Sequence, residues 1–331
     1  MIQDVVLDRD LFCPGQPAFR VEADNVVVDL GGHTIAGDGT SAGVDVSYGV
    51  ESAHIRNGRI SNFWAGAALY GTRSTITNIE FSDNHVGIEN GGNGTRVSSS
   101  RFLRNFLGIN MFDVPPYGGV IEDSIFEGQE GSAVSASQYD GVIVRNNRIA
   151  GNRVGLSLSM ARRWDVVDNT FLRNGHGVEL GNAESEGNRF RGNRFLENQV
   201  GLQIGEASVG DGQAHGFAVV PDTIVRGNQF MRNDAAGLLI LLTVGEAQGS
   251  LVEENRFVRN GYAPGGVENL STAPVDDGLH AEGPVTAGFT VRNNMFVANA
   301  DYGVEAPEIS DGGGNKGRAN GNRGQCLGVS C

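Results

Sequence analysis

The stretch Asn193-Arg-Phe-Leu-Glu-Asn198-Gln-Val-Gly201-Leu202 decides the fold, because variants of it recur along nearly the whole chain. Each variant has an apolar anchor, and most anchors are 21 to 27 residues apart. Asn follows the anchor by three residues in eight copies and precedes it by two in six. A fixed internal period of this length is the signature of stacked structural repeats. The eleven anchors are Ile35, Ile60, Phe81, Phe102, Ile125, Ile149, Phe171, Phe195, Phe230, Phe257 and Phe296.

Each repeat has the pattern of three short strands separated by Asn or Gly turns, and no long segment has the 3.6-residue period of a helix. Asn tolerates the left-handed backbone of such turns, and its amide can bond to the next Asn. One repeat cannot bury its apolar positions alone, but stacked repeats share a core. We therefore predict a single-domain, all-β solenoid of about eleven coils. Residues 1–24 would form a cap and first strand, residues 25–310 the solenoid and residues 311–331 a tail.

Composition and charge exclude several classes of function. The net charge is −14, with 39 acidic against 25 basic residues, and such a field repels nucleic acid and anionic lipid. No apolar run approaches the 18 residues of a membrane-spanning helix, so we expect no membrane insertion. We expect no nucleic-acid partner either.

Three cysteines are present, and two of them lie close together at the end of the chain. Cys326 and Cys331 are spaced as C-x4-C, which predicts a disulfide that fastens the tail. Cys13 is left over. No signal peptide precedes the first strand pattern, Val5-Val6-Leu7.

The repeat resembles the right-handed parallel β-helix repeat family, the pectate-lyase-like superfold whose best-known members act on polysaccharides. Asp8-Arg-Asp-Leu-Phe-Cys13-Pro, Val26-Val-Val-Asp29-Leu-Gly-Gly-His33-Thr-Ile35 and Asp311-Gly-Gly-Gly-Asn315 are similar to segments of secreted bacterial members. The resemblance implies a secreted or cell-surface bacterial protein with a polysaccharide or oligosaccharide partner. It does not choose a reaction, because this repeat hosts lyases, hydrolases, epimerases and non-catalytic proteins.

The resemblance implies that a glycan would lie along one sheet, whose outward positions follow each Gly-apolar pair. One outward row is predicted to run Asp45, Ala68, Glu89, Asn110, Ser135, Ser157, Glu179, Gln203, Leu239, His280 and Glu305. Polar side chains with interspersed aromatic rings suit a sugar-binding face. The predicted substrate-binding residues are Glu89, Asn110, Ser157, Gln203, Trp164 and Tyr262.

Two insertions narrow the choice of catalytic residues, because long loops on a rigid scaffold are where function concentrates. They span residues 206–221 and 261–277. Removal of a proton next to a uronate carboxylate needs a base and a cation, which Arg162, Arg163, His215 and His280 could supply. Hydrolysis needs two carboxylates, and the first pairs to consider join Glu179 to Asp211, Asp276 or Asp277.

Asp276, Asp277 and Glu282 also form a candidate Ca²⁺ cluster. Two hypotheses remain open. The first is a polysaccharide-processing enzyme, a lyase, epimerase or hydrolase, that works in a groove on the sheet. The alternative is a non-catalytic extracellular scaffold or glycan-binding protein. The Asp-Pro-His-Asp signature of mannuronan epimerases is absent, and Lys316 is the only lysine, which weighs against lysine-dependent uronate lyases.

Overall fold

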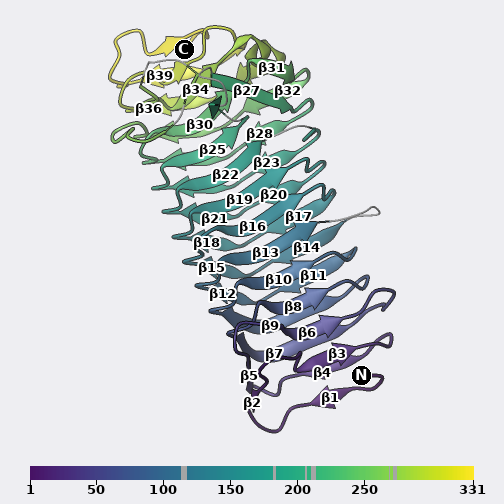
Figure 1. Cartoon of the computed structure of the whole chain (residues 1–331). Helices are drawn as coiled ribbons and strands as arrows, with labels where there is room; N and C mark the ends of the chain where they lie inside the picture. Colours follow the sequence, from purple (N-terminus) through teal and green to yellow (C-terminus); the bar gives the residue numbers. More distant parts are fainter. Residues whose placement is uncertain (113–117, 182–183, 206, 210–213, 268, 271–273) are drawn as a thin grey trace. The chain divides into compact units, whose positions relative to one another are not determined.

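A computed structural model describes the chain except for residues 113–117, 182–183, 206, 210–213, 268 and 271–273, and the side chains of 206–217. The chain forms two compact units, Met1–Arg153 and Val154–Cys331. In each unit, every turn of the backbone adds one short strand to each of three parallel sheets (Figure 1). We call these the first, second and third sheets, in the order in which the chain enters them.

In the first unit, the parallel pairing of successive turns builds all three sheets. Strands β7 (His54–Ser61) and β9 (Thr75–Ser82) are long enough to run through both the first and the second sheet. The other strands of the first sheet are β1 (Val5–Val6), β4 (Val27–Asp29), β11 (Thr95–Ser98), β14 (Gly119–Glu122) and β17 (Val142–Arg145). Those of the second are β2 (Leu11–Phe12), β5 (Thr34–Ala36), β12 (Arg101–Leu103), β15 (Ile125–Glu127) and β18 (Arg148–Ala150). The third sheet holds β3 (Phe19–Val21), β6 (Ala42–Val46), β8 (Ala65–Leu69), β10 (Val86–Asn90), β13 (Leu107–Phe112) and β16 (Ser132–Ser137).

The second unit repeats this arrangement. Its first sheet holds β20 (Asp165–Val167), β23 (Arg189–Arg191), β28 (Ile224–Arg226), β32 (Ser250–Glu253), β35 (Phe289–Arg292) and β38 (Ser310–Gly313). Its second holds β21 (Thr170–Leu172), β24 (Arg194–Leu196), β29 (Gln229–Met231), β33 (Arg256–Val258), β36 (Met295–Val297) and β39 (Lys316–Arg318). Its third holds β19 (Val154–Ser159), β22 (His176–Gly181), β25 (Val200–Ile204), β30 (Ala236–Leu241), β34 (Leu279–Glu282), β37 (Val304–Glu305) and β40 (Cys326–Leu327). A small added sheet contains β26 (Ala207–Val209), β27 (Ala214–Val219) and β31 (Val244–Glu246), and the 3₁₀ helix η1 spans Pro284–Gly288.

The described chain is therefore all-β, a parallel β-helix of about 12 turns, close to the eleven coils that the repeat predicts. No helix among the described residues is long and apolar enough to cross a membrane. The predicted disulfide joins Cys326 to Cys331, and Cys13 is not disulfide-bonded.

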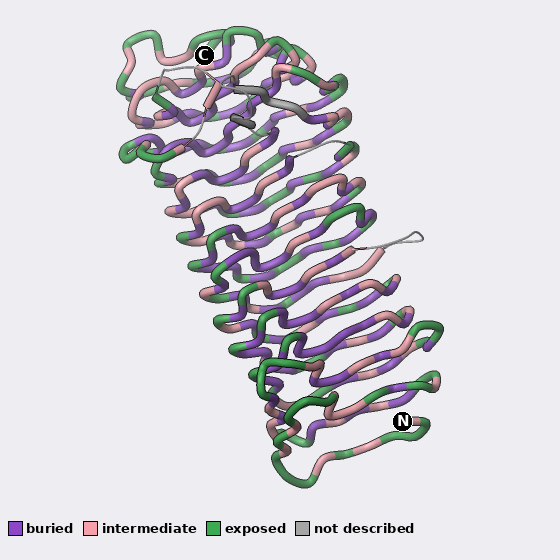
Figure 2. The backbone as a smooth tube through the Cα atoms, viewed as in Figure 1, coloured by how far each residue is buried: buried purple, intermediate pink, exposed green. Residues whose placement is uncertain are grey.

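The predicted anchors lie in the core, which runs up the inside of each unit (Figure 2). In the second unit the rings of Phe171, Phe195, Phe230, Phe257 and Phe296 stack with centroids 4.7–4.9 Å apart. One anchor is wrong by one residue: Phe126, not Ile125, pairs with Phe102 and is fully buried. Both residues are apolar, and Gln129 stands where other repeats have Asn, so the register was ambiguous in the sequence.

Two asparagine ladders confirm the predicted stacking of amides. In the second unit, Asn198 Nδ2 donates to Asn233 Oδ1 at 3.1 Å, and Asn233 Nδ2 donates to Asn260 Oδ1 at 2.9 Å. The ladder residues also bond to buried backbone, as Asn198 Nδ2 does to the Phe171 carbonyl at 3.1 Å. The left-handed backbone falls on the residue before the ladder Asn, such as Glu197 with φ of 55°. The amide is thus needed for its hydrogen bonds, not for the turn conformation.

Candidate active site

The third sheet presents the predicted outward row in the predicted register. In the first unit Asp45, Ala68, Glu89, Asn110 and Ser135 are register partners on successive strands. In the second unit the row runs Ser157, Glu179, Gln203, Leu239, His280 and Glu305. Because side chains alternate across a strand, one residue from each strand contributes to this line.

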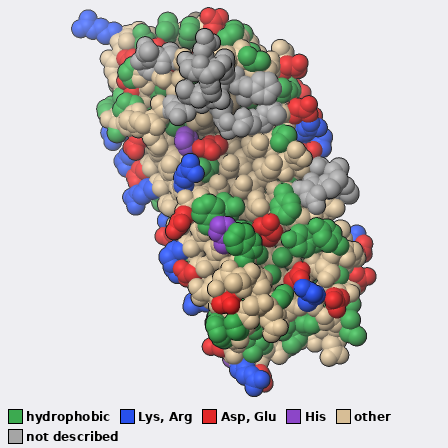
Figure 3. All heavy atoms as spheres, viewed as in Figure 1, with side chains coloured by type: hydrophobic (Ala, Val, Ile, Leu, Met, Phe, Trp, Pro, Cys, Tyr) green, Lys and Arg blue, Asp and Glu red, His purple; other side chains and the backbone are tan. Residues whose placement is uncertain are grey.

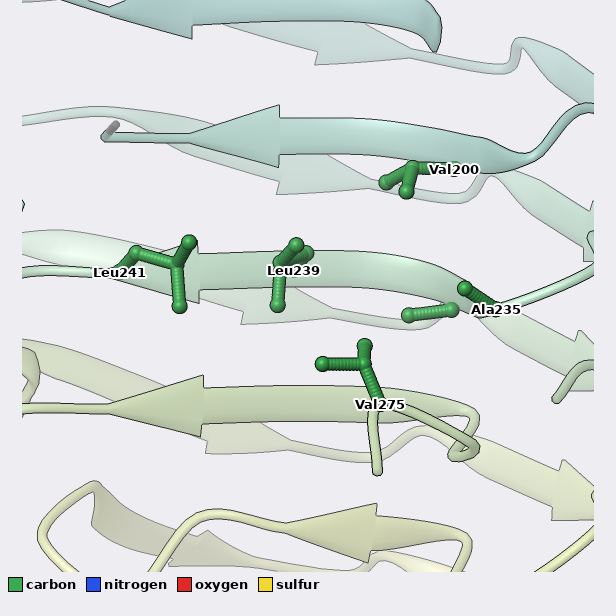
Figure 4. Close-up of a cluster of buried hydrophobic side chains, with 6 residues drawn as sticks. Val200, Ala235, Leu239, Leu241 and Val275 are labelled. Carbon is green, nitrogen blue, oxygen red and sulfur yellow. The ribbon is translucent and has the colours of Figure 1, made fainter. Parts of the chain in front are cut away.

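The second insertion packs over the row in the second unit. Leu239 is fully buried, although it points out of the sheet. It lies in an apolar cluster with Val200, Ala235 and Val275 (Figure 4), and Val267 and Leu270 pack against that cluster. The insertion also bonds to the sheet, because Gln199 Nε2 donates to the Gly265 carbonyl at 2.8 Å. The described residues of this insertion thus form one wall of the site around His280.

His280 is the centre of the site beyond this wall. Its ring is 2% exposed, and both of its nitrogens meet carboxylates. Nδ1 lies 2.8 Å from Asp277 Oδ2 and 3.4 Å from Glu305 Oε2, and Nε2 lies 2.9 Å from Glu282 Oε1. Asp277 is fully buried and its Oδ1 also accepts the Tyr302 N–H at 2.8 Å. An imidazole with an acceptor at both nitrogens is held in one orientation and favours the doubly protonated form.

The carboxylates and the histidine shift one another's pKa values. Burial by itself would lower the pKa of His280, but the hydrogen bonds to Asp277 and Glu282 and their negative charges raise it to about 9. Burial, together with the charge of Asp277, raises the pKa of Glu305 to about 7. Asp277 and Glu305 share a hydrogen bond, and the proton belongs to Glu305 because Asp277 has the closer contact with the imidazolium. Burial also raises the pKa of Asp277, against the lowering effect of its hydrogen bonds to His280 and to the Tyr302 N–H. At neutral pH the site therefore combines a charged histidine with a Glu305 carboxyl group that is about half protonated.

A cavity of about 470 Å³ opens beside this cluster. Its walls come from the ends of β34 and β37, the segments that follow them, and the insertion. Its lining residues are Thr243, Leu270, His280, Ala281, Glu282, Gly283, Pro284, Glu305, Pro307 and Glu308. The cavity thus offers three glutamate side chains on otherwise apolar walls. This composition suits a binding site for part of a polar ligand.

Two overlapping groups in this region have the spacing to hold a cation. Asp277, His280 and Glu305 have ligand atoms within 4.8 Å of one another, and so do Asp276, Asp277 and Asp301. The second group offers only oxygens, the ligands that Ca²⁺ takes. The first includes the His280 imidazole, which must lose a proton before it can bind a metal. Of the predicted Ca²⁺ set, Asp276 and Asp277 are therefore together, whereas Glu282 contacts the other face of the cluster through His280 Nε2.

The predicted residue Glu179 does not lie in this cluster. It precedes His280 by three strand steps in the row, about 14 Å at the usual strand spacing, and its Oε1 is 2.8 Å from His176 Nδ1. Gln203, its neighbour in the row, is half-buried and donates from Nε2 to the Gly205 carbonyl at 3.1 Å. Ser157 is half-buried on the same row. The predicted pairing of Glu179 with Asp276 or Asp277 is not formed.

The Arg162-Arg163-Trp164 corner lies apart from the row, just before β20 of the first sheet. Arg162 forms an ion pair with Glu184, and Arg163 is exposed. Trp164 was predicted to bind substrate, but its ring is fully buried and packs in the core. A tryptophan at a corner was ambiguous, because the sequence does not say whether the ring turns inward or outward.

The remaining predicted residues fall in or near the insertions. Tyr262 is exposed, and its hydroxyl donates to the Ala298 carbonyl at 3.0 Å. His215 lies on β27, opposite Ser208 of β26, but its side chain is outside the described part of the structure. Asp211 is also outside the described residues. In the first unit, Glu89 and Asn110 are half-buried neighbours, 3.4 Å apart between Asn110 Nδ2 and Glu89 Oε2.

Glu305 and Glu308 are the site residues that the sequence reasoning missed. Glu305 stood in the predicted outward row, one strand after His280, and this position was the available signal. Glu308 follows the end of β37 and is exposed on the cavity wall. No repeat position marks it, because the connection from the third sheet to the first sheet differs in length from turn to turn.

Comparison with known proteins places the chain in a family. The model of the "Right handed beta helix region" family matches residues 65–212 and 115–243, which together cover more than half of the chain. The protein therefore belongs to the right-handed β-helix family. A search of curated proteins found no significant match.

Several solved structures share the fold. The catalytic unit of a GH87 α-1,3-glucanase from Streptomyces thermodiastaticus is 13% identical, with a TM-score of 0.58, covering 92% of this chain and 63% of the glucanase. An endo-xylogalacturonan hydrolase from Aspergillus tubingensis is 11% identical, with a TM-score of 0.60, covering 82% of this chain and 92% of the hydrolase. A mutant tailspike protein of E. coli bacteriophage HK620, in complex with a pentasaccharide, is 15% identical, with a TM-score of 0.56, covering 93% of this chain and 66% of the tailspike. This chain thus spans less than two thirds of the glucanase unit, and at these identities the likeness concerns the fold alone.

Proposed function

We propose that the protein is a polysaccharide-processing enzyme of the hydrolase type, with its active site in the cavity beside His280. The observation that carries the proposal is Glu305, a carboxyl group on the cavity wall whose pKa is raised to about 7. Glycoside hydrolysis needs one carboxyl group that is protonated at the working pH and a second that is ionised. A raised carboxyl pKa in a cavity with other carboxylates meets the first requirement.

Each residue of the cluster has a separate role in this proposal. Glu305 acts as the general acid and gives its proton to the glycosidic oxygen as the C–O bond breaks. Glu308, an exposed carboxylate on the same wall, acts as the base that activates water. Glu282 is a positioning residue, since its Oε1 contacts His280 Nε2 and its Oε2 accepts the Leu270 N–H at 2.7 Å. Asp277 keeps the proton on Glu305 by its charge.

The charge of the site favours a neutral glycan over a uronate polymer. The cavity is lined by three glutamates and no arginine or lysine among the described residues. Proton removal next to a uronate carboxylate would need a cation to neutralise that carboxylate, and His280 is already enclosed by its own carboxylates. The predicted lyase or epimerase set of Arg162, Arg163, His215 and His280 is therefore the weaker proposal.

Fold likeness and the disulfide add support of a general kind. Proteins named as a glucanase and a xylogalacturonan hydrolase share the fold, and a tailspike with the fold is in complex with a pentasaccharide. The Cys326–Cys331 disulfide suits an oxidising compartment, so we propose that the protein acts outside the cytoplasm. A non-catalytic scaffold or glycan-binding protein is the alternative.

The test compares four glutamine variants, at Glu305, Glu308, Glu179 and Glu246, on a panel of neutral and acidic polysaccharides. Glu305→Gln should lower kcat/KM by at least about a hundredfold on natural substrates, the usual size of an acid–base contribution. It should retain most activity on a substrate whose leaving group needs no protonation. Glu308→Gln should lose activity on both substrates and regain it with azide. Glu246→Gln is the matched control, because Glu246 is exposed on β31 and does not line the cavity.

The outcome separates the hypotheses. A Glu305→Gln variant with unchanged activity, together with loss of activity in Glu179→Gln, would move the site back to the middle of the row. Unsaturated products would indicate a lyase. If the protein cleaves none of the polysaccharides but binds one of them, the non-catalytic alternative is favoured.

A further inference from the structure

The second sheet of the second unit has an outward face that is rich in basic side chains. The face consists of the outward positions of β21, β24, β29, β33, β36 and β39 and of the turn residue that follows each strand. Among these described positions, Glu197 is the one acidic residue. Figure 3 shows basic side chains along the edge of the molecule at which Figure 1 labels β21, β36 and β39. The basic residues, all exposed, are Arg173, Arg194, Arg232, Arg256, Arg259, Lys316 and Arg318.

The equivalent positions of the first unit pair most of their arginines with carboxylates. Arg59 and Arg101 contact Glu80 at 2.8 and 3.2 Å, and Arg104 contacts Asp83 at 2.8 Å. The second unit offers one carboxylate for seven basic side chains on this face. The excess of positive charge is therefore specific to the second unit, and stacking of the repeat does not require it.

Three of these arginines surround a hollow of about 290 Å³ on the face. Its floor is apolar, because Met231, Val258 and Val297 occupy the same outward position in successive turns. Arg256 stands at the start of β33, and an arginine follows the end of both β29 and β33, so guanidinium groups reach the floor from both ends of the strands. The lining residues are Met231, Arg232, Arg256, Val258, Arg259, Val297 and Ala298.

The arginines of the hollow have few partners within the protein. Arg256 and Arg259 form no ion pair with the part of the chain that the structure describes, and Arg232 reaches the Glu197 carboxylate at 3.7 Å. Arg232 and Arg259 hold the same position in successive turns, about 4.8 Å apart along the stack, and like charges in this arrangement repel each other. Asp234 is exposed and lines an adjoining hollow, not this one. A bound anion would replace the repulsion between the arginines by attraction.

We infer that this hollow is a binding site for a phosphate monoester. Each of Arg232, Arg256 and Arg259 would donate to one of the phosphate oxygens, and the carbon next to the phosphate would lie on the apolar floor. A phosphate monoester has three strong acceptor oxygens and a charge of about −1.5 to −2 at pH 7, and guanidinium groups match such oxygens in geometry. A carboxylate has two oxygens and a single charge, so it would leave one arginine without a partner.

Size and location define the ligand further. A volume of about 290 Å³ is at the lower limit of ordinary small-molecule pockets, so the hollow takes a phosphate with a short substituent rather than a large ligand. The hollow lies on the second sheet, whereas Glu305 lies on the third, so the site is separate from the proposed active site. The net charge of −14 does not exclude an anion here, because charges more than about 8 Å away are largely screened at physiological ionic strength.

Calorimetric titration of the intact protein tests the site. The probes are glycerol 3-phosphate, inorganic phosphate and acetate, each at pH 8 and at the same ionic strength. Sedimentation with vesicles of phosphatidic acid in phosphatidylcholine, and with vesicles of phosphatidylcholine alone, distinguishes a phosphate on a lipid surface from a phosphate on a soluble molecule. Arg194→Gln is the matched control, because Arg194 is exposed on the same sheet and does not line the hollow.

We expect glycerol 3-phosphate and inorganic phosphate to bind at least about tenfold more tightly than acetate. Arg256→Gln and Arg259→Gln should each weaken phosphate binding at least about tenfold, because each removes a charge-assisted hydrogen bond. Both side chains are exposed, so these variants should keep the fold, which circular dichroism would check. Arg194→Gln should change the affinity less than about threefold, since β24 lies two strand spacings, about 10 Å, from β33.

Equal affinity for phosphate and acetate would overturn the inference, and so would unchanged phosphate affinity in folded Arg256→Gln and Arg259→Gln variants. Self-association at low salt that Arg256→Gln abolishes would identify the acidic surface of a second copy as the occupant instead. Glu305→Gln should bind glycerol 3-phosphate like the wild type, because the readout is binding on another sheet. Failure of the proposed hydrolase and failure of this site are therefore distinguishable.

Discussion

Replacement of one ladder asparagine tests whether the amide ladder stabilises the fold. Asn294 is buried, and its Oδ1 accepts the Asn255 N–H at 2.9 Å. Its Nδ2 donates to the Val252 carbonyl at 2.9 Å. Asn294→Ala leaves both of these buried backbone groups without this partner. At about 1–3 kcal/mol for each unsatisfied group, we expect the free energy of unfolding to fall by roughly 2–6 kcal/mol.

The adjacent residue provides the control. Asn293 is exposed and has φ of 54°, a conformation that glycine adopts without strain. Asn293→Gly should therefore change the free energy of unfolding by less than about 1 kcal/mol. Both variants would be unfolded in urea and followed by circular dichroism, with hydrogen exchange at Asn255 as a local measurement. Equal stability of the two variants, or continued protection of the Asn255 amide in Asn294→Ala, would refute the reasoning.

Three further predictions concern the His280 cluster. First, the His280 pKa is raised from 6.5 to about 9, so the folded state binds more protons than the unfolded state between these pH values. The free energy of unfolding should therefore fall as pH rises from 6.5 to 9, by at most about 3 kcal/mol. Urea unfolding of His280→Gln should lack this decline, and the same pH dependence in the variant and the wild type would contradict the prediction. Second, kcat/KM should fall as pH rises past about 7, when Glu305 loses its proton, whereas a rate that still climbs above pH 8 would rule Glu305 out as the acid. Third, Asp277→Asn removes the buried charge that is paired with the His280 imidazolium and should lower the free energy of unfolding by roughly 3–5 kcal/mol. Thermal unfolding at pH 6 would measure this loss, and a change below about 1 kcal/mol would disprove the prediction.

The repeat was enough to predict the third sheet's outward row without error, from Asp45 to Glu305. Two constraints act together there: the alternation of a strand has a period of two, and each Gly-apolar pair marks the same place in every turn. A shift by one residue would put charged side chains in the core. In the second sheet the register could not be predicted at Ile125 and Phe126, because either of these adjacent apolar residues could serve as the anchor.

The site itself was harder to predict, because its geometry comes from segments outside the repeat. Position in the row predicts that Leu239 and His280 point outward, but it cannot predict that both are buried. Leu239 is covered by Val267, Leu270 and Val275 of the second insertion, which lies outside the repeat. His280 is enclosed by Asp277, at the end of that insertion, and by Glu305, one turn later. A periodic pattern specifies neighbours one turn apart, whereas a loop can bring in partners from any distance.

The free-energy cost of burying the charged His280 cluster is the strongest reason to look for function there. The row positions of earlier turns hold Ser157 and Gln203, which need no partner to be tolerated on a sheet face. At His280 the same position holds a buried imidazolium that contacts three carboxylates. Two of them, Asp277 and Glu305, have a raised pKa. Hydrophobic side chains of similar volume would stabilise the turn at least as well. Stacking of the solenoid does not need this arrangement, whereas the general acid that we propose at Glu305 would use it.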